Sequence, residues 1–220
     1  MRNSLFLALL CASSAPAATI IQTDGTLTGI PDGSAAGVAR SLTVSGSGES
    51  VSSVTVDLNI SAAGGSAFLG DLYFYLTNGS EVAVLMNRAG RRTGALAGYS
   101  DNQSMSITLS DAAANDLHNY RVPLTGSHNV PLAGPLVGLW QPDARLSDPA
   151  TVLDSDARTN SLGIFTGDPA DGTWSLFAAD LSSGAAHQIN SWTLTLQTIP
   201  EPGTAALSLA ALAALLRRRR

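Results

Sequence analysis

Aspartates are the residues of this sequence that are best suited to chemistry. Fourteen of the seventeen acidic residues are Asp, the short carboxylate that favours turns and suits hard cations such as calcium. Asp32 follows Pro31 in a loop that leads into a strand pattern, and Asp71 begins a later one. Each carboxylate could cap backbone N–H groups of a turn, or could ligate calcium together with nearby carbonyl oxygens. Both interpretations stay open.

A second group of oxygen ligands occurs in the segment "DSDARTN". Asp154, Asp156 and Asn160 are spaced loosely as in an oxygen-rich calcium loop. The segment lacks the glycine and the bidentate glutamate that such loops carry at their sixth and twelfth positions. Asp32, Asp71, Asp154 and Asp156 are therefore the candidate calcium ligands, and calcium is the one cofactor that the sequence suggests.

The remaining reactive side chains do not form a recognisable catalytic set. The histidines His118, His128 and His187 each lie in a polar, loop-like context and are expected on the surface. The sequence has no ordered Asp-His-Ser signature, no His-Glu-x-x-His and no phosphate loop. We expect a protein without catalytic residues. Trp140 lies in an irregular stretch from about 110 to 160, where an exposed indole could stack on a sugar or a protein partner.

The charge of the central region excludes some partners. Without Arg2, Glu201 and the four C-terminal arginines, the chain has seven arginines against sixteen acids, a net charge of −9. Such a surface repels nucleic acid and anionic lipid. We therefore expect no nucleic-acid partner.

The elements that must position these residues are strands. In "VSSVTVDLNI" Val54, Val56, Leu58 and Ile60 alternate with polar residues, and "GDLYFYL", "EVAVLM", "GTWSLFAAD" and "NSWTLTLQ" alternate in the same way. This period of two predicts half-buried antiparallel strands, with Trp174 and Trp192 in the core. Asn78-Gly79 predicts a type I′ hairpin. One short helical turn is expected in "LSDAAANDLHNY", and the fold class is all-β, a β-sandwich or jelly roll.

The two ends of the chain carry targeting patterns. "MRNSLFLALLCASSAPAATI" has Arg2, an apolar stretch and small residues at 15–17, which predicts a signal peptide over residues 1–18, cleaved by signal peptidase near Ala17 or Ala18. No cysteine remains after its removal. The other end, residues 199–220, reads Ile199, Pro-Glu-Pro, an apolar run and four arginines. As a helix the run spans roughly 20 Å, too short for a permanent anchor, so we expect a transient membrane association.

The ends together resemble the PEP-CTERM proteins of Gram-negative bacteria. The resemblance rests on Pro200, Glu201 and Pro202, the apolar run, and Arg217, Arg218, Arg219 and Arg220. It implies that a membrane-embedded exosortase recognises this sorting motif, removes the tail and releases the protein to the cell surface or extracellular matrix.

The region between the ends, residues 19–198, resembles the P/Homo B domain of proprotein convertases. "GIPDGSAAGVARSLTVSG", "VSSVTVDLNI", "GDLYFYLTNGSEVAVL" and "FTGDPADGTWSLFAADLSSGAAHQINSWTLTL" follow the order of that family's motifs over about residues 27–197. The resemblance implies a jelly-roll β-sandwich of eight or nine antiparallel strands. In convertases this domain stabilises a subtilisin-like catalytic domain, which has no counterpart here.

Three functions are compatible with these patterns. The first is an exported, non-catalytic surface or matrix protein, in contact with extracellular polysaccharide or surface proteins. The second is a calcium-dependent module that binds carbohydrate or a partner. The third is an accessory domain for a separately encoded subtilisin-like protease.

Overall fold

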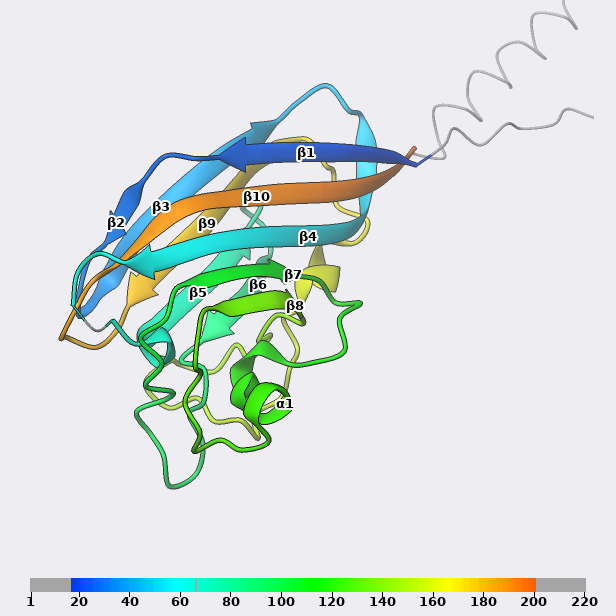
Figure 1. Ribbon diagram of the computed structural model, residues 1–220. Coiled ribbons are helices and arrows are strands. Elements are labelled where there is room, and N and C mark those ends of the chain that lie inside the picture. The colour runs from blue at the N-terminus through cyan, green and yellow to red at the C-terminus, as the bar shows by residue number, and fades with distance from the viewer. Residues whose placement is uncertain (1–16, 66, 201–220) are drawn as a thin grey trace, which may run out of the picture.

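The structure is a computed structural model that describes residues 17–65 and 67–200. The described residues form ten strands in two sheets that pack face to face (Figure 1). Sheet A contains β1 (Ala18–Asp24), β10 (His187–Pro200), β4 (Glu49–Ala62), β7 (Met105–Leu109) and β8 (Leu136–Trp140) in that order, with β2 (Thr28–Ile30) also paired to β10. Sheet B has the order β3 (Ser34–Val44), β9 (Gly172–Asp180), β5 (Leu72–Thr77), β6 (Val82–Asn87). The expected all-β sandwich is confirmed.

One strand pair departs from the expected antiparallel pattern. All the paired strands run antiparallel except β7 and β8, which are parallel. A parallel pair needs a long crossover connection. Residues 110–135 provide it and contain the 3₁₀ helix η2 (Leu117–Asn119) and the helix α1 (Arg121–Thr125). The helical turn expected in this stretch is confirmed.

The alternating strand patterns place the predicted side chains in the core. Val54, Val56, Leu58 and Ile60 of β4 are buried, because every second side chain of a strand points to the same face. Trp174 and Trp192 are fully buried, as expected. Trp174 packs edge to face against Phe165 of the 3₁₀ helix η3 (Leu162–Phe165), with ring centroids 5.0 Å apart.

Strand β6 differs from the expectation that only alternate residues are buried. Residues 83–87 are all buried. The reason is a long segment, residues 143–160, that pairs with the outer edge of β6. Ala144 N donates to Val84 O at 2.8 Å, and Val84 N donates to Asn160 O at 2.9 Å. An edge strand is thereby covered, as sheet proteins usually require.

The predicted hairpin is present, but its turn is of another type. Strands β5 and β6 are joined by residues 78–81. Among the described non-glycine residues only Arg88 and Ala144 have positive φ, so Asn78 lacks the conformation of a type I′ turn. Instead, Asn78 Oδ1 accepts hydrogen bonds from Ser80 N at 3.1 Å and Glu81 N at 3.0 Å. The side chain of Asn78 thus closes a longer loop.

Both ends of the described chain lie at one end of the sandwich (Figure 1). Ala18 in β1 pairs with Thr198 in β10. The strands reach slightly past the expected domain boundaries of 19 and 198, because Ala18, Ile199 and Pro200 also pair within sheet A. No helix among residues 17–65 and 67–200 is long and apolar enough to cross a membrane. Residues 1–16 of the expected leader over 1–18, together with Glu201, Pro202, the apolar run and Arg217–Arg220, lie outside the described residues.

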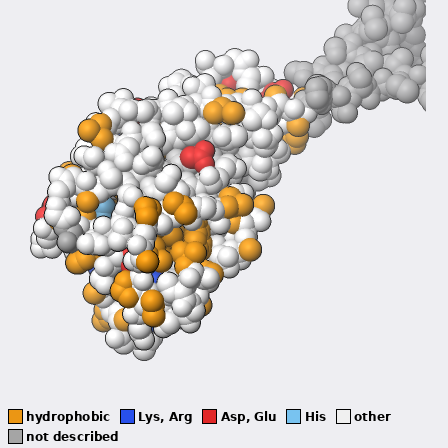
Figure 2. Space-filling model, viewed as in Figure 1, with side chains coloured by type: hydrophobic (Ala, Val, Ile, Leu, Met, Phe, Trp, Pro, Cys, Tyr) orange, Lys and Arg blue, Asp and Glu red, His pale blue; other side chains and the backbone are white. Residues whose placement is uncertain are grey.

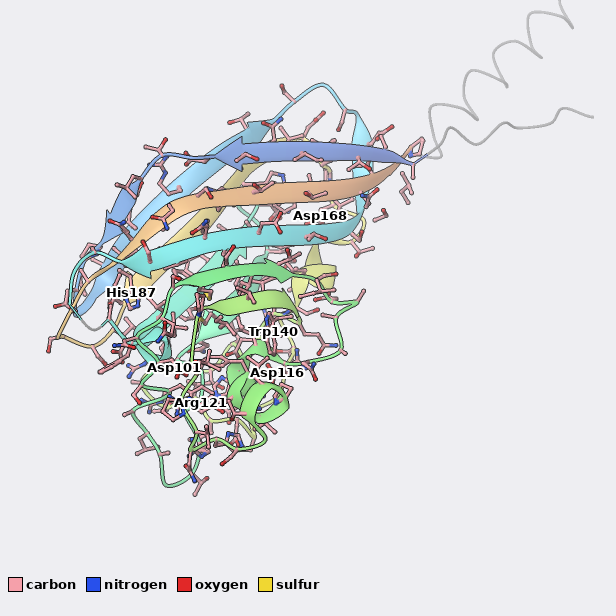
Figure 3. All side chains as sticks on the ribbon, in the orientation of Figure 1. Asp101, Asp116, Arg121, Trp140, Asp168 and His187 are labelled. Carbon is pink, nitrogen blue, oxygen red and sulfur yellow. The ribbon has the colours of Figure 1, made fainter. Side chains whose placement is uncertain are left out.

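The long connections gather on one side of the molecule, next to β8 and α1 (Figure 1). We call this region the loop lobe, residues 88–104, 110–135 and 141–161. Asp101 holds part of it together: its carboxylate accepts hydrogen bonds from Tyr120 Oη, Arg121 Nε and Leu132 N, each at 2.7 Å. Asp101 and Arg121 lie close together in this lobe (Figure 3). The lobe supplies the walls of the candidate site.

Candidate functional site

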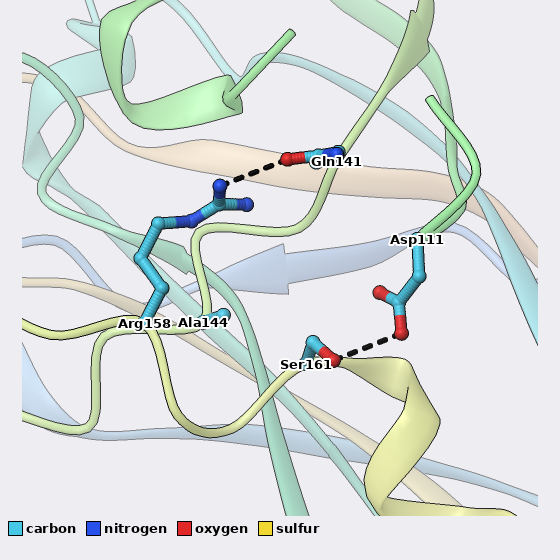
Figure 4. Close-up of a pocket in the computed structure, with 5 residues that line it drawn as sticks. All are labelled: Asp111, Gln141, Ala144, Arg158 and Ser161. Atoms are coloured by element: carbon cyan, nitrogen blue, oxygen red, sulfur yellow. Dashed lines mark hydrogen bonds between the residues drawn. The ribbon is translucent and has the colours of Figure 1, made fainter. Parts of the chain in front are cut away.

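A polar cleft opens where three loops of the lobe meet. It has a volume of about 200 Å³ and is lined by Asp111, Gln141, Ala144, Arg158 and Ser161 (Figure 4). Asp111 follows β7, Gln141 and Ala144 follow β8, and Arg158 and Ser161 precede η3. The parallel pairing of β7 and β8 brings the ends of both strands to the same edge of sheet A, and the loops that follow them form the cleft.

Asp111 forms one wall and is held by the start of η3. Its Oδ2 accepts hydrogen bonds from Ser161 Oγ at 2.9 Å and Gly163 N at 2.6 Å, and its Oδ1 accepts one from Leu162 N at 3.2 Å. The carboxylate therefore caps N–H groups at a helix start. Part of its acceptor capacity remains for a ligand, because an ionised carboxylate has about four lone-pair sites.

Arg158 forms the opposite wall and is also fixed (Figure 4). Its Nη1 donates to Gln141 Oε1 at 2.8 Å, and its Nη2 donates to Pro142 O at 2.8 Å. Gln141 is held in turn, since its Nε2 donates to Ala113 O at 2.7 Å. The cleft thus presents a guanidinium and a carboxylate on rigid supports. Such a pair can donate to and accept from the hydroxyl or amide groups of a polar ligand.

The floor of the cleft includes a strained residue. Ala144 has φ of 61°, a left-handed conformation that is uncommon for a residue other than glycine. The conformation is held from both sides: Ala144 N donates to Val84 O, and Ala144 O accepts from Thr159 N at 2.9 Å and Asn160 N at 3.0 Å. Residues held in such conformations cluster at binding sites. This makes the cleft the best-supported candidate site of the described chain.

Behind the cleft lies a buried ion cluster, which we define as Asp116, His118, Asp143 and Arg145. His118 and Asp143 are fully buried, and His118 Nδ1 lies 2.7 Å from Asp143 Oδ2. Arg145 bridges the two acids, with Nη1 3.1 Å from Asp143 Oδ1 and Nη2 2.8 Å from Asp116 Oδ2. Buried charges are stable only when they are paired in this way.

Both ring nitrogens of His118 face acceptors in this cluster. Its second ring nitrogen, Nε2, lies 2.9 Å from Arg91 O, an arrangement that favours the imidazolium form, in which both nitrogens donate. Burial by itself would lower the pKa of His118, but the hydrogen bond and the negative charge of Asp143 outweigh it and raise the pKa. A buried imidazolium with both N–H groups engaged holds loops together and has no free nitrogen to act as a general base.

The expectation that the histidines lie on the surface is wrong for His118 and His187. His187 is 1 % exposed, and its Nδ1 lies 2.7 Å from Asp180 Oδ2 at the far end of the sandwich from Trp140 (Figure 3). Nothing in the polar sequence around either residue indicates burial, because the covering elements come from distant parts of the chain. The third histidine, His128, lies 2.6 Å from the Tyr99 hydroxyl through Nδ1.

Two of the predicted calcium ligands meet the same turn. Asp32 Oδ2 accepts a hydrogen bond from Gly184 N at 3.1 Å, which is the capping role considered for it. Asp71 Oδ1 lies 3.5 Å from Arg88 Nη2, and Ser182 also bonds its carboxylate. Burial raises the pKa of Asp71, against the opposing effects of Ser182 and Arg88. Both carboxylates thus help to fix the connection between β9 and β10.

Asp154 and Asp156 lie elsewhere, in the segment that covers β6. Asp156 Oδ2 accepts a hydrogen bond from Leu153 N at 3.1 Å, while Asp154 contributes backbone bonds to Arg91 and Arg145. Among the residues that the structure describes, no three His, Cys, Asp or Glu side chains form a group that could hold a metal ion. Calcium ligation by Asp32, Asp71, Asp154 and Asp156 stays a prediction.

The expectation of an exposed indole at Trp140 is wrong. Trp140 ends β8 and is 3 % exposed, and its Nε1 donates to Val137 O at 3.0 Å. The stretch around it looks irregular in the sequence, yet it contains a strand that pairs with β7 and turns the indole inward. Trp140 is a core residue, so stacking on a ligand is excluded for it.

The residues that line the cleft were not predictable from their spacing. Asp111 lies about fifty residues before Arg158 and Ser161 in the chain, and no local motif connects it to them. One signal was present: arginines are interspersed with aspartates in "PDARLSD" and "DSDAR", a pattern that is compatible with ion pairs inside a folded loop. Comparisons with known proteins add no family, since neither a scan of protein-family models nor a search of curated proteins gave a match.

Proposed function

We propose that this chain is an exported, non-catalytic β-sandwich protein of a Gram-negative bacterium, processed at both ends and placed at the cell surface or in the extracellular matrix. One observation carries the proposal: the sandwich fills the interval between the two targeting patterns and overlaps them only at Ala18, Ile199 and Pro200. Sheet A begins at Ala18 and ends at Pro200, and the buried apolar side chains of the described residues fall between Ile30 and Leu196. Signal peptidase and an exosortase could remove both ends without touching that core.

We further propose that the sandwich is a jelly roll of the P/Homo B type. The Gly-Asp-Leu motif lies at the join of the 3₁₀ helix η1 (Leu69–Asp71) and β5. Gly-Thr-Trp begins the neighbouring strand β9, whose other end pairs with Leu72. The Asn-Ser-Trp-Thr-Leu motif lies in β10, in the middle of sheet A. Three of the four motifs that carry the resemblance thus involve interior strands, while the opening Ile-Pro-Asp lies at the end of β2 and in the turn before β3.

A non-catalytic role is supported by the state of the histidines. His118 and His187 are buried and paired with carboxylates, so neither faces a solvent-filled site. The cleft between Asp111 and Arg158 favours a second candidate function, the binding of a sugar residue or another polar group of a partner. The two functions are compatible, because a matrix protein can hold polysaccharide.

The sorting proposal predicts that the Pro-Glu-Pro segment is required for tail removal. We expect Glu201→Gln or Pro202→Ala to leave residues 203–220 attached and the protein cell-bound, because the processing enzyme would no longer recognise its motif. Mass spectrometry of the protein from its host reports both ends. Glu81→Gln in the β5–β6 hairpin is the matched control and should be processed normally. Tail removal that is unchanged in both motif variants would contradict the exosortase proposal.

A further inference from the structure

Five exposed apolar side chains gather on the loop lobe beside sheet A. We define the apolar patch as Val122 and Leu124 of α1, Val130, and Val137 and Leu139 of β8. Their exposed fractions lie between 38 % and 56 %. Figure 2 shows hydrophobic side chains collected over the surface that β8 and α1 form. A contiguous exposed patch of roughly several hundred Å² on a soluble domain usually marks an interaction site.

The chain segment that carries the patch is free of charge in a strongly acidic protein. Two charged side chains from other segments border it: Arg92, whose Nη2 donates to Asn129 Oδ1 at 3.0 Å, and Asp57, which lies two strands away from Leu139 in sheet A. Residues 122–142 contain no Asp, Glu, Lys or Arg. The two flanking charges are buried: Arg121 pairs with Asp101 at 2.7 Å, and Asp143 belongs to the ion cluster. Asp116, which lines a hollow together with Val122, is paired with Arg145. Burial, aided by Arg92, lowers the pKa of His128, so this residue is neutral at pH 7.

This charge distribution selects among possible occupants. A cationic partner gains nothing from an uncharged patch and would be drawn to the acidic remainder of the surface. An anionic polysaccharide or lipid is repelled by the net charge of −9. A two-fold contact brings the same surface of both copies together, so an acidic surface would face another acidic surface. Two such acidic molecules can approach most closely through a neutral apolar surface.

We propose that two copies of this chain associate through the apolar patch. The inference is independent of the sorting proposal, because it rests on the folded domain alone. Strand β8 is an edge strand, paired on one side to β7. Its free edge is irregular, because Gly138 has φ of 102° and the Trp140 indole N–H already donates a hydrogen bond to Val137 O. The contact is therefore made by side chains rather than by extension of the sheet, which favours a closed dimer over a growing fibre.

The size of the patch sets the strength of the dimer. Roughly several hundred Å² per copy is at the low end of specific interfaces, which corresponds to a weak, reversible association. We expect a dissociation constant of about 10–100 µM. Salt should strengthen the dimer, because it screens the repulsion between two acidic molecules.

Sedimentation velocity of the protein purified from its host tests the proposal. The wild type should shift from monomer to dimer between about 5 and 500 µM, and its dissociation constant should fall about threefold or more from 50 to 500 mM NaCl. Leu139→Glu should raise the dissociation constant at least tenfold. Ile21→Glu is the matched control, because Ile21 is 61 % exposed on β1 at the opposite edge of sheet A, and it should dimerise normally.

Three results would overturn the proposal. In the first, the wild type stays monomeric up to about 500 µM. In the second, the Leu139→Glu variant associates as strongly as the wild type. In the third, Ile21→Glu weakens association as much as Leu139→Glu does. Leu124→Glu in α1 is the second variant and replaces Leu139→Glu if circular dichroism shows that the latter is unfolded. A dimer held by the C-terminal apolar run would persist in both patch variants, and it would therefore count against the proposal.

Discussion

His118 and its partners show how single residues hold the loop lobe in place. The imidazolium joins Asp143 of one loop to the carbonyl of Arg91 in another, and Arg145 links Asp143 to Asp116. The same segment supplies Gln141 and Ala144 to the cleft. His118 therefore helps to hold the segment that supplies these cleft residues.

The raised pKa of His118 predicts that the protein loses stability as the pH rises. Folding increases the proton affinity of His118. The contribution of this residue to the free energy of unfolding is therefore fully present below the unfolded pKa of about 6.5, and it is lost as the pH rises through the higher folded pKa. Urea unfolding at several pH values above 6.5 measures this loss. His118→Gln should lower the free energy of unfolding by about 2–3 kcal/mol at pH 6 and flatten the slope above pH 6.5.

The other shifted histidine gives an internal check on this prediction. Burial, aided by the charge of Arg92, lowers the pKa of His128. The contribution of His128 to the free energy of unfolding has the opposite pH dependence. It is lost as the pH falls below 6.5, because the unfolded chain then binds a proton more readily than the folded chain does. A slope above pH 6.5 that survives in His118→Gln would mean that the buried pair is not its source.

At the scale of elements, the turn η1 depends on close backbone contact with the loop lobe. Gly70 N donates to Tyr99 O at 2.9 Å, and Gly70 O accepts from Arg88 Nε at 2.8 Å. A Cβ at position 70 would lie 2.3 Å from Tyr99 N and 2.5 Å from Tyr99 O. These atoms belong to the backbone and cannot move aside as a flexible side chain would. Glycine is required here by space, since its φ is ordinary.

Gly70→Ala is therefore expected to destabilise the fold strongly. The loss should be about 3 kcal/mol or more, because the added methyl separates η1 from the loop at residues 97–101. Thermal unfolding of the variant measures it. Gly29→Ala in β2 is the matched control: nothing lies within 4 Å of its added Cβ, so its stability should stay within about 0.5 kcal/mol of the wild type. If both variants were equally stable, the close contact between Gly70 and the backbone of Tyr99 would be refuted.

At the scale of the whole molecule, strand pairing joins the two ends of the domain. Residues of β1 pair with β10 from Ala18↔Thr198 to Asp24↔Trp192, and β10 also pairs with β4 along most of its length. The first and last strands, β1 and β10, are thus neighbours in one sheet. An isolated sandwich must therefore keep both strands.

The fragment 18–200 is accordingly expected to fold by itself. It should unfold in one cooperative transition, with a melting temperature within about 3 °C of that of the protein from its host. The fragment 25–200 lacks β1, which exposes the edge of β10 and removes Ile20 from its contact with the core. Its melting temperature should be lower by roughly 6–12 °C, as for a loss of about 3 kcal/mol. A non-cooperative melt of 18–200 would contradict the proposed domain limits.

The sequence by itself determined the strand content, the two-sheet class and most of the core. Alternation of apolar and polar residues is a local property, and a strand turns it directly into an inner and an outer face. Trp174, Trp192 and the apolar residues of β4 were therefore predictable. Asn78-Gly79 marked a hairpin, although the number of loop residues, and hence the turn type, depended on where the strands stop pairing.

Only the tertiary structure decided the burial of the polar groups and the place of the cleft. Strand β6 is buried because residues 143–160 cover it, His118 lies between Asp143 and the carbonyl of Arg91, and the pairing of β8 with β7 turns Trp140 into the core. No short window of sequence contains both a residue and its cover. Asp111 meets Ser161 through the crossover that makes β7 and β8 parallel. Ion pairs and clefts of this kind are built from contacts between residues far apart in the chain, and such contacts exist only after the sheets have packed.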